Sequence, residues 1–471
     1  MSLVKRYVGT GVFYKTLLAV AIPIVIQNGI TNFISLLDNV MVGRIGTEQM
    51  SGVSIVNQLI FVFNLCIFGA LSGVGLFSAQ FFGKRDHEGV RYTFRFKFLV
   101  SIALCVAALL LFLLAGDPLI RLYLHEGGET GDIDATFRYA REYLAISLLG
   151  LVPYTLTQIY ASTLREVGHT VPPMTAGIIG VFVNLALNYL LIFGALGFPK
   201  MGVEGAALAT VISRFVECII VVLWTHLHTD QCEFIKDVYA SFRVPRALVR
   251  KITVTGTPLL LNEALWAAGQ AMLLQCYSLR GIAAVSAMNI TTTVFNTFSV
   301  IYLSIGTAIS ILIGHRLGAG EKDTALSDAR KMIAFAGLMG LAAGALIAVS
   351  APFFPMIYNT TDEVRAMATR LTLVIAAFAP FHAILNSCYF TLRSGGKTIL
   401  TFFFDCAYVW GINIPTVLAL TYLTPFSTAQ IYLACHLTEL IKWVIGIVLV
   451  EKGVWLNDMT AQENQQKEAT S

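Results

Sequence analysis

The chain has 471 residues, of which 56% are hydrophobic and only 13% are charged. A soluble globular domain usually carries about 25% charged residues, so this composition excludes an ordinary water-soluble enzyme. The mean hydropathy of +0.73 indicates more apolar residues than soluble cores can bury, and predicts that lipid is the solvent for most of the chain. The net charge of +4 offers no basic surface for nucleic acid.

Long segments without charged residues predict membrane-spanning helices, because one crossing of a bilayer needs about 20 apolar residues. Residues 49–83 and 281–315 each form a 35-residue run without Asp, Glu, Lys or Arg. Such runs are continuous rather than alternating, which favours helices over the strands of a membrane barrel. In chain order we expect twelve spans: 15–40, 53–82, 95–115, 143–164, 172–195, 204–226, 255–278, 285–314, 332–351, 371–392, 399–423 and 428–450.

The distribution of Lys and Arg predicts the orientation of these spans, since cytoplasmic segments are enriched in both. With a cytoplasmic N-terminus, the inner segments hold 22 of the 32 basic residues and the outer loops hold eight. This count assigns Lys15, Arg95 and Lys97, at the inner ends of their spans, to the inner segments. The other two basic residues, Arg214 and Lys442, lie in the interior of spans. We therefore predict that both termini are cytoplasmic. The first span is expected to be retained, because no cleavage site closes a short apolar core.

A short internal repeat divides the chain into two halves. The sequence TLREVGHT at 163–170 returns as TLRSGGKT at 391–398 with five identities in eight, and Pro23 and Pro258 match at a similar offset. Two six-helix halves of the same orientation imply a pseudo-two-fold axis along the membrane normal. We predict an N-terminal lobe at 1–230, a cytoplasmic linker at 231–254, and a C-terminal lobe at 255–471 that ends in a short polar cytoplasmic tail.

This organisation favours a transporter, because two like lobes that rock around a central site provide alternating access. The sequence contains no HExxH zinc motif, no nucleophile elbow and no ATP-binding GxxxxGK[ST] loop, so we expect no enzyme, no catalytic residue and no cofactor. The eight cysteines form no CxxC pair and are interpreted as small core residues. A passive channel or a membrane enzyme without these motifs remains an alternative.

Several stretches resemble the multidrug and toxic compound extrusion (MATE) family, in its bacterial type. They are LDNVMVGRIG at 37–46, GVEGAALAT at 202–210, PLLLNEALW at 258–266, and the two LRxxGxT copies. The resemblance covers nearly the whole chain and implies an all-α, twelve-helix, two-lobe antiporter in a plasma membrane, which in a bacterium is the inner membrane. It further implies export of lipophilic organic cations in exchange for H⁺ or Na⁺. The expected partners are the lipid bilayer and the substrate, with the chain as a monomer.

Ionisable residues inside the membrane are costly and indicate candidate functional sites. Arg214 with Glu217 and Glu439 with Lys442 are spaced i, i+3, so each pair is predicted to neutralise itself on one helix face. Three carboxylates then lack a basic partner in their own helices: Asp38, Glu263 and Asp405.

Asp38 is the leading candidate for ion coupling, because apolar surroundings disfavour the ionised carboxylate and allow it to exchange H⁺ or accept Na⁺. The resemblance implies that it belongs to an N-lobe cation site with Asn184 and Asn188, four residues apart on one helix face, and with Thr210. Some relatives have Asp where Asn188 stands, so one carboxylate must serve here, which favours H⁺; beyond Na⁺ at Asp38 we expect no metal. Alternatively, Asp38 extends to the outer interface near Arg44.

Glu263 looks like the carboxylate of the family's C-lobe site, although Asn386 stands where an acidic partner is expected. We predict a polar network in the C-terminal lobe from Glu263, Asn262, Gln270, His382 and Asn386. For Asp405 we give equal weight to two roles, a hydrogen bond between helices and gating. His382 and His436 are expected to be hydrogen-bonded core residues rather than proton carriers. Pro23 and Pro258 interrupt the first and seventh spans at matching positions and are candidate hinges.

A flippase for lipid-linked precursors is a second functional hypothesis. It would require several unpaired Arg or Lys residues in the cleft to bind pyrophosphate. The basic residues predicted in the interior of spans are Arg214 and Lys442, and each has a nearby carboxylate. The sequence therefore favours cation export over flipping.

Overall fold

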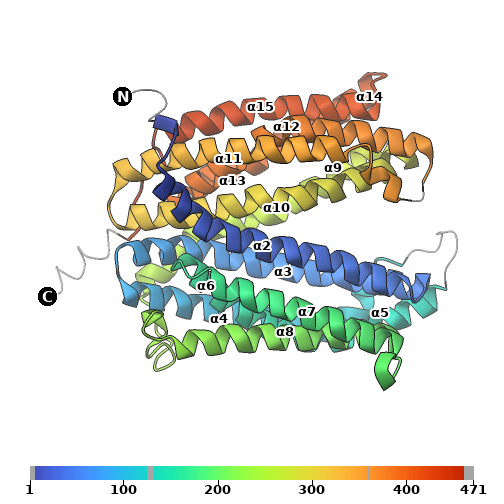
Figure 1. Ribbon diagram of the computed structural model, residues 1–471, viewed down its shortest axis with the longest axis horizontal. Helices are drawn as coiled ribbons and strands as arrows, with labels where there is room; N and C mark the ends of the chain where they lie inside the picture. The colour runs from blue at the N-terminus through green and yellow to red at the C-terminus, as the bar shows by residue number, and fades with distance from the viewer. Residues whose placement is uncertain (1–5, 125–131, 359, 461–471) are drawn as a thin grey trace. The chain divides into compact units, whose positions relative to one another are not determined.

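The computed structural model describes residues 6–124, 132–358 and 360–460, without the side chains of 34–37, 39, 40 and 282 (Figure 1). Every regular element among these residues is a helix. The predicted polar tail at 461–471 lies outside the described residues. The fold is all-α, as the sequence predicts.

Each of the twelve predicted spans coincides with a helical segment to within two residues at its ends, so the prediction of their positions is confirmed. The helices extend beyond most spans, because hydropathy detects the apolar stretch whereas the helix continues into charged turns. They are α2 (Gly11–Gly43), α3 (Thr47–Gly83), α4 (His87–Arg121), α5 (Ile133–Ser147) continuing into α6 (Leu151–Glu166), α7 (Val171–Phe193), α8 (Gly202–Leu227), α9 (Arg246–Ser278), α10 (Ile282–Gly318), α11 (Lys322–Ser350), α12 (Asp362–Ser394), α13 (Thr398–Phe402) continuing into α14 (Ile414–Leu423), and α15 (Thr428–Glu451).

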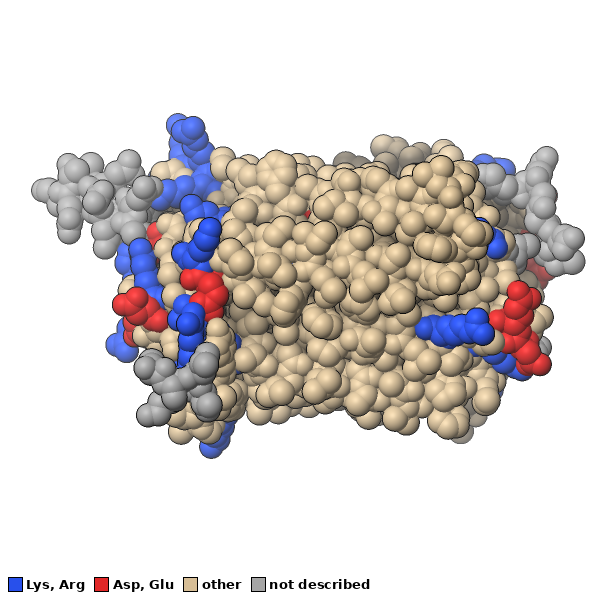
Figure 2. Space-filling model, turned by 90° about the horizontal axis from the view of Figure 1, so that it is seen from above, with Lys and Arg blue, Asp and Glu red and all other residues tan. Residues whose placement is uncertain are grey.

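Eleven helices among the described residues are long and apolar enough to cross a membrane. The helix outside this set is α9, whose apolar run is interrupted by Asn262, Glu263 and Gln270. Its 33 residues nevertheless reach about 50 Å at 1.5 Å per residue, beyond the roughly 30 Å of a hydrocarbon core. On the face in Figure 2, charged side chains gather at the two ends and the broad band between them is almost free of charge.

The helices form two compact units, each with its own packing. The N-terminal unit comprises the described residues of Ile26–Ser78 and His87–Arg250, and the C-terminal unit comprises those of Met1–Val25, Ala79–Asp86 and Lys251–Ser471. In the N-terminal unit α8 packs against α5, α6 and α7; in the C-terminal unit α12 packs against α10, α11 and α15. The predicted limits of the two lobes stay a prediction.

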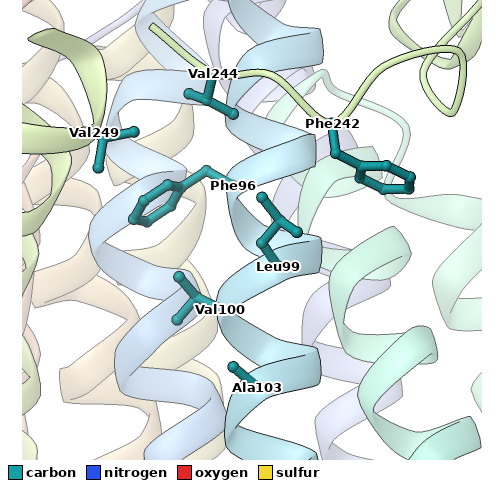
Figure 3. A pocket seen from close by; sticks show the side chains of 7 residues that line it. All are labelled: Phe96, Leu99, Val100, Ala103, Phe242, Val244 and Val249. Carbon is teal, nitrogen blue, oxygen red and sulfur yellow. The ribbon is translucent and has the colours of Figure 1, made fainter. Parts of the chain in front are cut away.

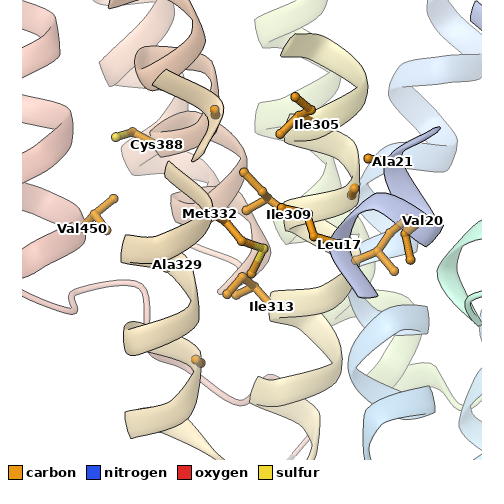
Figure 4. Packing of buried hydrophobic residues seen from close by; sticks show 14 of the residues in the cluster. Leu17, Val20, Ala21, Ile305, Ile309, Ile313, Ala329, Met332, Cys388 and Val450 are labelled. Atoms are coloured by element: carbon orange, nitrogen blue, oxygen red, sulfur yellow. The ribbon is translucent and has the colours of Figure 1, made fainter. Parts of the chain in front are cut away.

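The core of the C-terminal unit joins five helices through fully buried apolar side chains (Figure 4). Leu17 from the first half of α2 packs with Ile309 of α10 and Met332 of α11, and Cys388 and Val450 extend the cluster to α12 and α15. Lipid is as apolar as these side chains, so close packing rather than exclusion from water stabilises such contacts. The cluster positions α12 and α15, which carry most of the polar residues of the C-terminal unit that are discussed below.

The two LRxxGxT copies end helices in the same way. α6 ends at Glu166 and α12 at Ser394, and the glycine two residues further on has a positive φ in both, +85° at Gly168 and +74° at Gly396. A left-handed residue closes a helix C-terminus with little strain only when it is glycine. The repeated glycine is therefore explained by helix termination.

Small residues allow α11 and α12 to approach closely. A Cβ atom added to Gly340 would lie 2.6 Å from the Cβ of Ala383 and 2.8 Å from the Cα of Pro380. We expect Gly340→Ala to lower the free energy of unfolding by about 1–3 kcal/mol, because the two helices must separate. Unfolding of the detergent-solubilised protein measures this change.

Gly29→Ala is the control, since an added Cβ there meets no atom within 4 Å. This substitution should be neutral or gain about 0.5–1 kcal/mol from helix propensity. Equal stability of the two variants would contradict the close packing of α11 on α12.

Candidate functional site

The predicted N-lobe residues meet in one cluster inside the N-terminal unit. Asp38 of α2 accepts a hydrogen bond from Nδ2 of Asn188 at 2.5 Å. The same amide nitrogen lies 3.1 Å from Oδ1 of Asn184, and Nδ2 of Asn184 lies 3.3 Å from Oγ1 of Thr210 on α8. Asn184 and Asn188 are both buried, with 5% and 1% of their surface exposed. Three helices thus bring one carboxylate and three uncharged polar groups together.

The amides in this cluster can serve a carboxylate in more than one way. Turned by 180°, the amide of Asn184 places its nitrogen 2.9 Å and 3.2 Å from the two Asp38 oxygens, and its oxygen accepts from Thr210 at 3.3 Å. Oδ1 of Asn188 is buried and has no hydrogen-bond partner among the described residues. The cluster can therefore donate to an ionised carboxylate, or present oxygens to a proton or a small cation after amide rotation.

Arg214 and Glu217 form the predicted pair on α8. Nη1 of Arg214 lies 3.2 Å from Oε2 of Glu217, and its guanidinium lies over the ring of Tyr154, 5.1 Å from the centroid. The pair confirms that these two intramembrane charges compensate each other. Asp38 has no such ion-pair contact within 4.0 Å among the described residues.

In the C-terminal unit, Asp405 has a basic partner from another helix. Its Oδ1 lies 2.5 Å from Nζ of Lys442 on α15, and its Oδ2 accepts from Nδ2 of Asn262 on α9 at 3.2 Å. The predicted self-neutralising pair of Glu439 with Lys442 is therefore wrong. Lys442 extends to α13–α14 rather than along its own helix, because Asp405 lies within hydrogen-bonding reach.

Glu263 lies 3.8 Å from Nη1 of Arg393, the arginine of the second LRxxGxT copy. In the N-terminal unit the arginine of the first copy, Arg165, donates to Gln27 of α2 at 3.3 Å. Each copy thus places an arginine against the helix that carries the matching proline of its own half. The partner of Glu263 comes from a distant part of the sequence, which helix spacing alone does not detect.

The predicted C-lobe network is not one cluster. Asn262 joins Asp405 and Tyr389, whereas His382 lies near Glu439, with 3.6 Å between Nδ1 and Oε2. Gln270 is exposed and, among the described residues, forms no hydrogen bond or ion pair with either group. Asn386 lies one turn from His382 on α12, and its Oδ1 is buried without a partner among those residues.

The histidines also differ from the prediction of hydrogen-bonded core residues. Nδ1 of His436 lies 3.3 Å from Oε2 of Glu439. Both ring nitrogens of His436 and Nε2 of His382 are nevertheless buried without a hydrogen bond to any described residue. The three side chains form a separate cluster between α12 and α15.

The segment around Asp405 is wound more widely than an α-helix. Two π-helical segments, η5 (Phe403–Ala407) and η6 (Val409–Asn413), separate α13 from α14. Such turns are rare and occur often at functional positions. The prediction that Asp405 forms a helix–helix hydrogen bond is confirmed by Asn262, and a gating role stays a prediction.

One ion pair is not predicted from the sequence. Lys97, assigned to an inner segment, is fully buried and forms an ion pair with Glu166, with additional contacts to Ser162 and Thr163. In the loop before α9, burial raises the pKa of the Cys232 thiol to about 11, so this cysteine stays protonated and weakly nucleophilic at neutral pH.

An apolar hollow of about 360 Å³ lies in the N-terminal unit (Figure 3). Its walls contain no charged or polar side chain, so it offers nothing to bind an ion. The lining residues are Phe96, Leu99, Val100, Ala103, Phe242, Val244 and Val249. We do not assign it to the ion-coupling cluster.

Pro23 and Pro258 lie inside α2 and α9, and both helices continue through them. Each proline removes one backbone hydrogen bond. The hinge role stays a prediction.

Buried carboxylates inside bundles of apolar helices long enough to cross a membrane are typical of membrane transport proteins. The sequence model of the MatE family matches residues 23–190 and again residues 258–418. Together these ranges cover more than half of the chain, so the protein belongs to the MatE family of transporters. The two matches begin at the paired prolines, which confirms the internal repeat.

Two curated relatives resemble the chain along most of its length. "Probable multidrug resistance protein NorM" of Thermotoga maritima is 26% identical over 402 residues, covering 85% of this chain and 84% of the relative. "Multidrug resistance protein MdtK" of Pectobacterium atrosepticum is 25% identical over 424 residues, covering 86% and 88%. Among solved structures, one titled "Crystal structure of MATE in the bent conformation" has a TM-score of 0.84 at 19% identity, covering 95% of this chain and 97% of that one. This likeness supports the fold.

Proposed function

We propose that the protein is a secondary antiporter that exports lipophilic organic cations from the cell in exchange for H⁺ or Na⁺. It would act in the plasma membrane with both termini cytoplasmic, by alternating access of its two lobes. The names of the relatives, which are multidrug resistance proteins, support this substrate class. The observation that carries the coupling mechanism is the Asp38 cluster.

Asp38 is suited to bind a coupling ion because its neighbours are polar but uncharged. The amides of Asn184 and Asn188 and the hydroxyl of Thr210 surround one carboxylate, and Arg214 is already engaged with Glu217. A proton or Na⁺ would neutralise the only uncompensated charge of this cluster. Its arrival and release would therefore change the stability of the N-terminal unit in each half of the cycle.

The coordination favours H⁺ over Na⁺. Sodium needs several oxygens directed at one point, but the donor nitrogen of Asn188 faces Asp38 at 2.5 Å. A protonated Asp38 can donate to the amide oxygen of Asn184, which faces the carboxyl group before any rotation, whereas Na⁺ also requires the amide of Asn188 to turn. We therefore propose H⁺ rather than Na⁺ as the coupling ion.

The coupling ion is tested by dye transport into inverted vesicles that contain the protein. Ethidium uptake should follow an imposed pH gradient, acid inside, in the absence of sodium. An imposed Na⁺ gradient at equal pH on both sides should have little effect. Vesicles without the protein are the control. Uptake driven by Na⁺ alone would overturn the preference for H⁺, and uptake independent of both gradients would overturn the antiport mechanism.

A further inference from the structure

Three potential metal ligands meet between α12 and α15 of the C-terminal unit, apart from the residues of the proposed coupling site. They are His382, His436 and Glu439, whose ligand atoms all lie within 4.8 Å of one another. Sequence spacing does not reveal this set, because His382 lies on α12 and the other two ligands lie on α15. The i, i+3 spacing of His436 and Glu439 places both on one face of α15.

The distances in this cluster fit one metal ion. Oε2 of Glu439 lies 3.6 Å from Nδ1 of His382 and 3.3 Å from Nδ1 of His436. Ligands at about 2.0–2.2 Å from a tetrahedral Zn²⁺ are separated by roughly 3.3–3.5 Å. Two of the three distances between ligand atoms are therefore close to the values that such a site requires. Rotation of the imidazole rings would adjust the third distance, between the two histidines.

Both histidines have ring nitrogens that are free to bind a metal ion. His436 is only 8% exposed, and neither of its ring nitrogens forms a hydrogen bond with a described residue. Nε2 of His382 is also buried without a partner in that part of the chain. Buried nitrogens without partners are costly, and a metal ion would engage both rings and the carboxylate at once.

The local charge also favours a cation. Lys442 lies one turn beyond Glu439 on α15, but its ammonium group is held by Asp405 at 2.5 Å. With neutral imidazoles the cluster therefore carries one negative charge, inside walls formed by the rings of Phe295, Phe378 and Tyr432. A proton could compensate the carboxylate, but an imidazolium would leave N–H groups unpaired, because Glu439 is the only carboxylate near either ring among the described residues.

We propose that His382, His436 and Glu439 form a binding site for a divalent transition-metal ion of the Zn²⁺ type, which ties α12 to α15. The mixed set of two imidazoles and one carboxylate is typical of zinc sites that keep a further position for water. The inference is independent of the proposed transport function, because metal binding alone tests it.

The test is a titration of the purified full chain in detergent, without a histidine tag and after removal of metals by a chelator. Zn²⁺ is measured in competition with a chromophoric chelator, and the expected result is one ion per chain. His382→Asn and Glu439→Gln should each weaken binding by at least about tenfold, because each removes one ligand. Co²⁺ in place of Zn²⁺ should show the visible absorption of a tetrahedral site in the wild type only.

His169→Asn is the control, since His169 packs beside Trp224 in the N-terminal unit and should bind no metal. Size-exclusion profiles establish that the variants are folded, and Glu439→Gln, which keeps the side-chain shape, carries the test if His382→Asn fails. Zn²⁺ should also raise the unfolding temperature of the wild type more than that of Glu439→Gln. Absence of stoichiometric binding, or equal binding by wild type and Glu439→Gln, would overturn the proposal.

Discussion

The Asp38→Asn substitution is expected to reduce ion-driven dye transport to the level of vesicles that lack the protein. The amide cannot carry the exchangeable charge, so arrival of the ion would no longer alter the N-terminal unit. Because Asn has nearly the shape of Asp and can accept from Asn188, the helices α2, α7 and α8 should remain packed. Uptake of ethidium under an imposed pH gradient measures the loss.

Asp117→Asn is the matched control for this experiment. Asp117 lies near the end of α4, is about half exposed, and faces Arg141 at 3.5 Å, so its neutralisation should leave transport unchanged. Full ion-driven activity of Asp38→Asn at normal expression would refute a coupling role for this cluster.

The Glu263→Gln substitution tests whether the C-terminal half takes part in coupling ion movement to dye transport. Glu263 lies 3.8 Å from Arg393, so its charge already has a partner. A loss equal to that of Asp38→Asn would assign a comparable role to the C-terminal half.

Lys442→Met should cause the largest loss of stability among single substitutions in the C-terminal unit. Lys442 and Asp405 form a buried pair at 2.5 Å, with side chains 10% and 17% exposed. Removal of one partner leaves an uncompensated charge, which costs about 3–5 kcal/mol in a buried site. The expected result is a lower unfolding temperature in detergent and reduced yield of folded protein.

The double variant Asp405→Asn with Lys442→Met distinguishes the ion pair from simple packing. It removes both charges, so its loss of stability should be smaller than the sum of the two single losses. Lys452→Met is the control, because Lys452 is exposed just after α15 and should be neutral. Additive losses in the double variant would show that Asp405 and Lys442 are not coupled.

The fold was largely predictable, because the bilayer imposes one simple requirement. A span must be apolar for about 20 residues and must satisfy its own backbone hydrogen bonds as a helix, and both requirements can be read locally. The two LRxxGxT copies are also a local feature, because each is a short stretch of sequence that follows an apolar span. Even α9, the least apolar of the twelve, was placed correctly within Arg246–Ser278.

The N-terminal cluster was also accessible from the sequence. Asn184 and Asn188 are four residues apart, so helix geometry alone places them on one face. Asp38 is a membrane carboxylate without a basic partner in its own helix, and the family resemblance groups it with the two Asn residues and with Thr210. The structure brings all four together. Their role in coupling is a separate question that transport measurements decide.

The sequence by itself determined the helices, the repeat and the short set of intramembrane carboxylates, because hydropathy and helix periodicity are local properties. Only the tertiary structure decided how these carboxylates are paired. Lys442 binds Asp405 rather than Glu439, Arg393 faces Glu263, and Glu439 joins two histidines. Long side chains reach across helix interfaces, so the energy of a charge inside the membrane depends on packing between segments that are distant in sequence.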